Sequence, residues 1–133
     1  MIVDANIATY WFADTPLSSR ARPLLGRDDL VAPKMIRLEV ARSLLKYLRV
    51  GLISQDQVRE AATRVGEYFS ELVDDDTLLR QAVELSIAYN HIVSDCLYLA
   101  LALARGEQFA TADRRLALLA RKLEIETNLI GTQ

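Results

Sequence analysis

The chain has 133 residues, of which about half are hydrophobic and about a quarter charged, and its formal net charge is −2. A chain of this length and balance predicts one globular domain, residues 1–133, that buries roughly two thirds of its unfolded surface. The small negative charge excludes a general electrostatic attraction to nucleic acid, so any such binding must come from a local patch.

Three features bear on the compartment. Cys96 is the sole cysteine, which excludes an internal disulfide and suits a reducing environment, and we expect it to pack as a small hydrophobe. The amino-terminal residues MIVDAN contain an acid and no basic leader, so no secretory signal is expected. The longest apolar run, Cys96 to Ala104, is far shorter than the roughly 20 residues that span a bilayer. We therefore expect a soluble, cytoplasmic protein that does not use a membrane.

The first half of the chain alternates short apolar runs with longer amphipathic segments. In chain order it predicts a strand, two short helices, a second strand and two long helices, over 2–3, 7–12, 18–25, 30–32, 34–50 and 54–72. Gly51 ends the first long helix. Ser54 and Gln57, three residues apart, predict a capping box at the start of the second.

The second half continues the alternation. It predicts a brief edge strand, two helices, a strand, a helix and a last strand, over 72–73, 77–90, 95–104, 108–111, 114–123 and 125–130. The acidic run 74–76 is expected to cap the first of these helices. The helix that Asp95 opens is apolar on nearly every side, so it must be buried centrally, and Gly106 ends it. Short strands separated by helices predict βαβ units around a parallel sheet.

Four carboxylates fall where this topology predicts one edge of the sheet. Asp4 and Asp113 come at the carboxyl ends of predicted strands, and Asp95 lies at the amino end of the buried helix. Glu39, in the second turn of the helix that follows the second strand, can reach the same edge. Because ligands of open parallel sheets bind beyond the carboxyl ends of the strands, the four acids can converge on one site.

Such a cluster requires a counter-charge. Two like charges ~4 Å apart repel by about 4 kcal/mol at an effective dielectric near 20. Protonation with raised pKa values would relieve this repulsion, and a divalent cation would relieve it better. Oxygen ligands favour a hard ion, Mg²⁺ or Mn²⁺, which activates water and stabilises the charge of a phosphoryl transition state.

Each acid also has a plainer interpretation. Asp95 and Asp113 can cap their own helices, which is compatible with metal binding. Glu39 lies three residues before Arg42, where a surface ion pair worth a few tenths of a kcal/mol is an ordinary arrangement. Asp4 is the hardest to explain in this way, because a carboxylate beside the core gains no structural benefit.

Other features suggest further contacts. The segment from Arg20 to Arg49 contains eight basic residues and only three acids, which predicts either a phosphate-binding patch or a solvated surface. The aromatic run Tyr10–Phe12 can stack on RNA bases, although packing or a protein interface is the favoured interpretation. His91, the sole histidine, precedes the buried helix and is interpreted as a loop residue.

The chain resembles the PIN-domain ribonucleases, and among them the VapC toxins of bacterial and archaeal toxin–antitoxin pairs. The stretches that carry the resemblance are IVDAN, LEVARSLL, SDCLYLALALA and FATADRRL, in the family's order and spacing. Each motif is weak by itself, but the four together are specific and extend over essentially the whole chain. The resemblance implies an α/β fold, a three-layer αβα sandwich with a central parallel sheet of about five strands.

The resemblance also implies a function, a metal-dependent endoribonuclease that hydrolyses RNA phosphodiester bonds with metal-activated water. By motif match, the Mg²⁺ or Mn²⁺ ligands and catalytic residues would be Asp4, Glu39, Asp95 and Asp113, supported by Asn6 and Thr111. Similar toxins are homodimers that a small antitoxin protein silences. The alternative from another class is a catalytically silent binding module of the same fold. A structure-specific DNA nuclease uses similar acids but needs DNA-clamping elements, for which this chain has no room.

Overall fold

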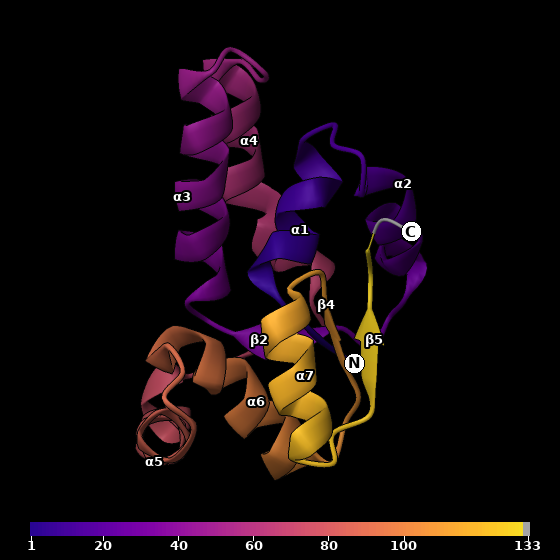
Figure 1. The fold of residues 1–133 in the computed structure, drawn as a ribbon. Helices are drawn as coiled ribbons and strands as arrows, with labels where there is room; N and C mark the ends of the chain where they lie inside the picture. Colours follow the sequence, from indigo (N-terminus) through magenta and orange to yellow (C-terminus); the bar gives the residue numbers. More distant parts are fainter. Residues whose placement is uncertain (132–133) are drawn as a thin grey trace.

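The computed structural model describes residues 1–131, so residues 132 and 133 of the predicted domain lie outside the described residues. Its centre is a five-stranded sheet in the order β3-β2-β1-β4-β5, of which Figure 1 labels β2, β4 and β5. The strands are β1 (Ile2–Val3), β2 (Val31–Pro33), β3 (Glu71–Val73), β4 (Phe109–Thr111) and β5 (Thr127–Leu129). Every pairing is parallel, with Ile2 opposite both Val31 and Phe109, so the carboxyl ends of all five strands lie at one edge.

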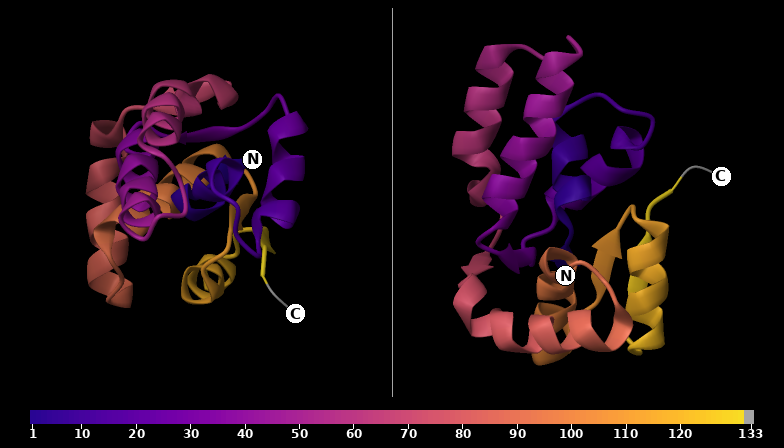
Figure 2. Two further views of the ribbon diagram at one scale, coloured as in Figure 1. Left: turned by 90° about the horizontal axis from the view of Figure 1, so that it is seen from above. Right: turned by 60° about the vertical axis from the view of Figure 1, so that its left-hand side comes forward.

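Helices cover both faces of this sheet. They are α1 (Ala5–Phe12), α2 (Ser18–Ala21), η1 (Arg22–Gly26), α3 (Ile36–Arg49), α4 (Gln55–Arg64), η2 (Val65–Tyr68), α5 (Asp75–Tyr89), α6 (Val93–Arg105) and α7 (Arg114–Lys122). Right-handed crossovers between parallel strands put α1–α4 on one face and α5–α7 on the other. The right-hand view of Figure 2 shows the α3–α4 and α5–α6 pairs on opposite sides. The predicted three-layer αβα sandwich is therefore confirmed.

The helix α6 lies at the centre of the core. All residues from Cys96 to Ala102 are buried, and the helix contacts β1, β2 and β4. Gly106 ends it with a φ of +61°, in the left-handed region that favours glycine. The predicted central burial of this helix is confirmed, as is the packing of Cys96 as a small hydrophobe. Within residues 1–131 no single helix is long and apolar enough to cross a membrane, and α5 and α6 meet that test only as a pair bent by 115°.

The fourth helix is shorter than its apolar spacing predicts. The capping box of Ser54 and Gln57 is present, but α4 ends at Arg64 instead of continuing to residue 72. The chain then turns through η2 and returns as the edge strand β3, which pairs with β2. Val65 and Phe69 still reach the core, from the turn and the loop rather than from one continuous helix. Apolar spacing alone does not reveal this break, since the same side chains are buried either way.

Two predicted caps are wrong. The helix α6 begins at Val93, so Asp95 is its third residue and does not cap it. The side chain of Asp74 does not cap α5 but forms an ion pair with Lys34 at 2.6 Å. Asp75 Oδ1 accepts a hydrogen bond from the Met35 amide at 3.1 Å. The acidic run therefore ties the start of α5 to the connection between β2 and α3, because the parallel strands bring these loops together at one edge.

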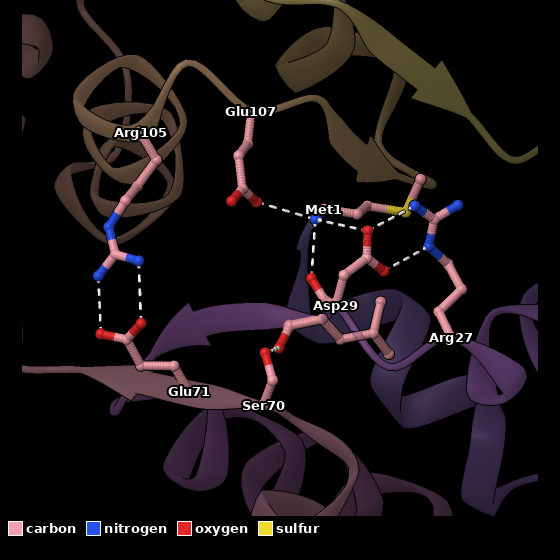
Figure 3. A network of polar contacts seen from close by, with 8 residues as sticks. Met1, Arg27, Asp29, Ser70, Glu71, Arg105 and Glu107 are labelled. Carbon is pink, nitrogen blue, oxygen red and sulfur yellow. Dashed lines mark hydrogen bonds and ion pairs between the residues drawn. The ribbon is translucent and has the colours of Figure 1, made fainter.

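At the opposite, amino-terminal edge of the sheet, ion pairs join the loops that lead into the strands (Figure 3). The Met1 amino group contacts Glu107 Oε2 at 2.8 Å and the Asp29 carbonyl oxygen at 2.9 Å. The Arg27 guanidinium donates two hydrogen bonds to the Asp29 carboxylate, both of 2.7 Å. Arg105, at the end of α6, does the same to Glu71 of β3, at 2.7 and 2.9 Å (Figure 3). Each of these three carboxylates has a cationic partner.

Candidate functional site

Asp4 follows the central strand β1, which places its carboxylate at the carboxyl edge of the sheet. The residue is only 6% exposed. Its Oδ2 accepts hydrogen bonds from Thr111 Oγ1 at 2.7 Å and from Asn6 Nδ2 at 3.1 Å. Burial raises the pKa of Asp4 to about 7; the Thr111 hydrogen bond opposes this rise, and the charges of Asp95 and Glu39 add to it. The negative form of this carboxylate is therefore disfavoured in the protein without a bound cation.

Asn6 and Thr111 connect Asp4 to the turn after β4. Asn6 Oδ1 accepts a hydrogen bond from the Ala112 amide at 3.2 Å, and Thr111 Oγ1 accepts one from the Asp113 amide at 3.0 Å. The ends of β1 and β4 are thus joined by side chains as well as by the sheet. Both residues donate hydrogen bonds to Asp4, as a supporting role would require. Their support of a ligand site stays a prediction.

Glu39 is half-buried on α3 and faces the central helix. Its Oε1 accepts a hydrogen bond of 2.7 Å from the hydroxyl of Tyr98, a fully buried residue of α6. Burial holds the pKa of Tyr98 well above its usual value, so this hydroxyl remains the donor. Burial also raises the pKa of Glu39, against the lowering effects of the Tyr98 hydrogen bond and the Arg42 charge. Among the described residues Arg42 makes no ion pair with Glu39, so the plain interpretation of Glu39 as half of a surface pair is wrong.

Asp95 has a partner that the sequence analysis missed. His91 Nε2 lies 2.9 Å from Asp95 Oδ2, and the two side chains are 7% and 25% exposed. Burial raises the pKa of Asp95, the His91 contact lowers it, and the charge of Asp113 raises it further. His91 does lie in the loop before α6, as expected. The signal that could have revealed the contact was the position of His91 just before the helix that carries Asp95.

Asp113 caps α7, as predicted. Its Oδ1 accepts hydrogen bonds from the Arg115 amide at 2.9 Å and the Leu116 amide at 3.1 Å. These bonds fix the carboxylate at the mouth of a pocket of about 140 Å³, whose lining is formed by Asn90, His91, Ile92, Asp95, Asp113 and Arg115. Asp95 and Asp113 therefore face the same hollow.

The structure brings the four acids to one edge of the sheet, but not as one ready-made cage. Asp4 interacts electrostatically with Glu39 and Asp95, and Asp95 with Asp113. Within residues 1–131, no three His, Cys, Asp or Glu side chains converge closely enough to form a metal site. In the same range no side-chain nitrogen of Lys or Arg lies within 4 Å of any of the four carboxylates.

These residues nevertheless fit a hard divalent cation. Mg²⁺ commonly takes one or two protein carboxylates and keeps several waters, so pairs of acids are sufficient as protein ligands. The oxygen-only donors of the four acids match this preference. Burial, together with the neighbouring acids, raises the pKa values of Asp4, Glu39 and Asp95, and a cation would offset both effects.

Comparison with known proteins adds an independent observation. The family model of the PIN domain matches residues 1–122 of this chain, a range that includes all four acids. The chain is also similar to ribonuclease VapC3 of Pyrobaculum aerophilum. The two are 28% identical over 120 residues, which cover 88% of this chain and 92% of that protein.

Proposed function

Because this chain belongs to the PIN domain family, we propose that it is a metal-dependent endoribonuclease that hydrolyses RNA phosphodiester bonds, with residues 1–133 as one nuclease domain. The observation that carries the proposal is the state of Asp4. A buried carboxylate with two hydrogen-bond donors, two acidic neighbours and no Lys or Arg partner in residues 1–131 is costly without a cation. The similarity to ribonuclease VapC3 supports RNA as the substrate.

In this proposal Asp4, Asp95 and Asp113 would hold a Mg²⁺ or Mn²⁺ ion, directly or through its water ligands, and Glu39 would complete the cluster or orient water. When bound, such an ion lowers the pKa of a water molecule and stabilises the charge of the phosphoryl transition state. The other residues of the site orient the carboxylates through hydrogen bonds. Thr111 and Asn6 hold Asp4 in one orientation, while Tyr98 and His91 do the same for Glu39 and Asp95.

We further propose that the protein is the toxin of a toxin–antitoxin pair, acts in the cytoplasm and is silenced by a small antitoxin protein. The similarity to a protein named VapC3 supports this role. A homodimer is also part of the proposal. The helix α5 exposes Leu79, Val83 and Ile87 at four-residue spacing, and such an apolar stripe suits burial against a second copy.

The proposal is tested with purified, antitoxin-free protein and single-stranded RNA. We expect cleavage with Mg²⁺ or Mn²⁺, no cleavage with EDTA, and a loss of at least about a thousandfold in Asp4→Asn, since loss of a metal ligand removes the ion that activates water and stabilises the transition state. Arg59→Ala, on an exposed face of α4, is the control and should cleave as the wild type does.

A catalytically silent binding module is the second candidate. It is favoured by one observation, the absence of a three-ligand metal site among the described residues. Folded protein that cleaves no RNA with either metal, yet still captures an antitoxin, would establish this candidate and end the ribonuclease proposal.

A further inference from the structure

A second hollow lies directly beside the acids, between α1 and α3. It has a volume of about 180 Å³, and its lining residues are Asn6, Thr9, Tyr10, Ser43, Lys46 and Tyr47. We refer to it as the two-tyrosine pocket. Of these residues, only Asn6 and Ser43 fall within the stretches that carry the resemblance, and the proposed catalytic role uses Asn6 only as a support for Asp4.

The two-tyrosine pocket is continuous with the proposed active site on both of its walls. On α1, Asn6 lines the pocket and donates to Asp4 Oδ2 at 3.1 Å. On α3, Ser43 and Tyr47 follow Glu39 at four-residue spacing, so the three side chains share one face of the helix. At 1.5 Å per residue, the pocket extends about 6 to 12 Å from Glu39 along α3. A group bound there would belong to the nucleotide next to the one whose phosphate is cleaved.

The chemistry of the lining suits a nucleotide. Tyr10 and Tyr47 are half-buried and come from different helices, so they form a partly exposed aromatic surface of the kind on which bases stack. Lys46 is exposed at the rim, makes no ion pair within residues 1–131, and can contact a backbone phosphate.

The rest of the aromatic run has a different role. Trp11 is buried, donates to the Ala21 carbonyl oxygen at 2.9 Å and packs against Phe69 and Tyr68. Phe12 packs against Tyr68 as well. Of the residues 10–12 that the sequence suggested for base stacking, only Tyr10 lines the two-tyrosine pocket.

We propose that the two-tyrosine pocket binds the nucleobase adjacent to the scissile phosphate, with Lys46 on the RNA backbone. This inference rests on the proposed ribonuclease function and adds a determinant of where the RNA is cut. The sequence-independent part of binding comes from Lys46. The preference for one nucleotide position comes from the stacking of its base on Tyr10 and Tyr47.

The test measures RNA binding rather than cleavage. The probe is a fluorescein-labelled RNA hexamer centred on the bond that the wild-type protein cuts, kept intact with EDTA and compared with hexamers that lack one base at a time. In the wild type, loss of the base beside the cut bond should weaken binding on the order of tenfold, the size of one base–aromatic stack. In Tyr10→Leu/Tyr47→Leu the same loss should change affinity less than about twofold, because the stack is already gone.

Matched variants separate stacking from folding. Tyr10→Phe/Tyr47→Phe keeps both rings and should behave as the wild type, and Tyr47→Leu alone carries the test if the double leucine variant does not fold. Lys46→Ala should weaken binding of every hexamer and reduce the slope of log affinity against log salt by about one, whereas Arg59→Ala should not.

The outcomes distinguish the two proposals. If the wild type cuts RNA but base removal costs the same in wild type and double leucine variant, the subsite is wrong and the ribonuclease stands. If the leucine variant binds RNA normally but loses antitoxin affinity, the pocket receives a protein side chain instead, and the inference is also wrong. If the wild type neither cuts nor binds RNA, both proposals fail together.

Discussion

The pKa values of carboxylates at the two edges of the central sheet are shifted in opposite directions. At the amino-terminal edge, the Arg27 guanidinium holds the pKa of Asp29 at about 2, and Arg105 lowers the pKa of Glu71. At the carboxyl edge, burial and mutual repulsion raise the pKa values of Asp4, Glu39 and Asp95. Asp29 and Glu71 at the amino-terminal edge have arginine partners, whereas Asp4 and Glu39 at the carboxyl edge make no ion pair within the described residues.

This contrast identifies which acids serve the fold and which do not. Paired carboxylates at loop ends stabilise the entry of the chain into each strand, and their removal should only weaken the protein. Unpaired buried carboxylates oppose folding, so their presence calls for a benefit outside the folded chain itself. Carboxylates at the two edges of one sheet thus carry opposite expectations for the same conservative change to an amide.

The largest expected effect on stability comes from Asp4→Asn without metal. The pKa of Asp4 rises from 3.8 in a free side chain to about 7 in the folded protein, so its favourable contribution is full below pH 3.8 and is lost as pH rises through 7. Asparagine stays neutral, and its oxygen can still accept from Thr111 and Asn6. At pH 8 the free energy of unfolding should rise by a few kcal/mol, with about 4 kcal/mol as the upper bound.

Urea unfolding with EDTA at pH 8, pH 6 and pH 4 measures this effect. The gain should shrink steadily as the pH falls, because the wild-type carboxyl becomes protonated and loses its disadvantage. An Asp4→Asn protein that is less stable than the wild type at pH 8 would mean that the carboxyl edge is already compensated.

A bound divalent cation should offset the repulsion among the carboxylates at the carboxyl edge and so stabilise the folded protein. Mn²⁺ at about one hundred times its dissociation constant should stabilise the wild type by about 2.7 kcal/mol at pH 8. The effect should weaken toward pH 5, since protons compete for Asp4 as the pH falls through 7. Thermal unfolding with and without Mn²⁺ measures it, and Asp4→Asn is the control in which most of the shift should disappear.

The fold was largely predictable because it depends on local patterns. The all-round apolar character of the sequence from Cys96 to Ala104 predicted a buried helix, and the spacing of Ser54 and Gln57 predicted a capping box; both are present. The end of α4 at Arg64 was not predictable, because Phe69 is buried whether it extends a helix or follows a turn.

The acids at the ends of β1 and β4 could be assigned to one edge, because parallel strands bring their carboxyl ends together. Their partners were harder to foresee. The hydrogen bond between Tyr98 and Glu39 joins residues 59 positions apart, and it depends on how α3 packs against α6. Tyr98 was counted only as part of an apolar helix, since a tyrosine ring packs like any other hydrophobe until its hydroxyl finds an acceptor.

Tyr98→Phe tests this long-range contact at the carboxyl edge. The change removes the hydroxyl that donates a hydrogen bond of 2.7 Å to Glu39 Oε1, and it keeps the packing of the ring against Phe109. We expect a loss of about 1 kcal/mol in the free energy of unfolding and a fall in cleavage rate on the order of tenfold. A structural role alone would lower stability without changing Mn²⁺ affinity, so titration with Mn²⁺ is the deciding measurement, with weaker binding expected.

The smallest effect is expected from Glu71→Gln at the amino-terminal edge. Glu71 and Arg105 are both substantially exposed, so loss of their paired hydrogen bonds should lower Tm by less than about 4 °C, and less still in high salt. Cleavage and Mn²⁺ affinity should not change. The result matters because α6 spans both edges, with Asp95 in its first turn and Arg105 at its last residue. If Glu71→Gln did slow cleavage, the helix would be transmitting a shift along its length. Unchanged cleavage would mean that the buried middle of α6 holds Asp95 in place whatever happens at Arg105.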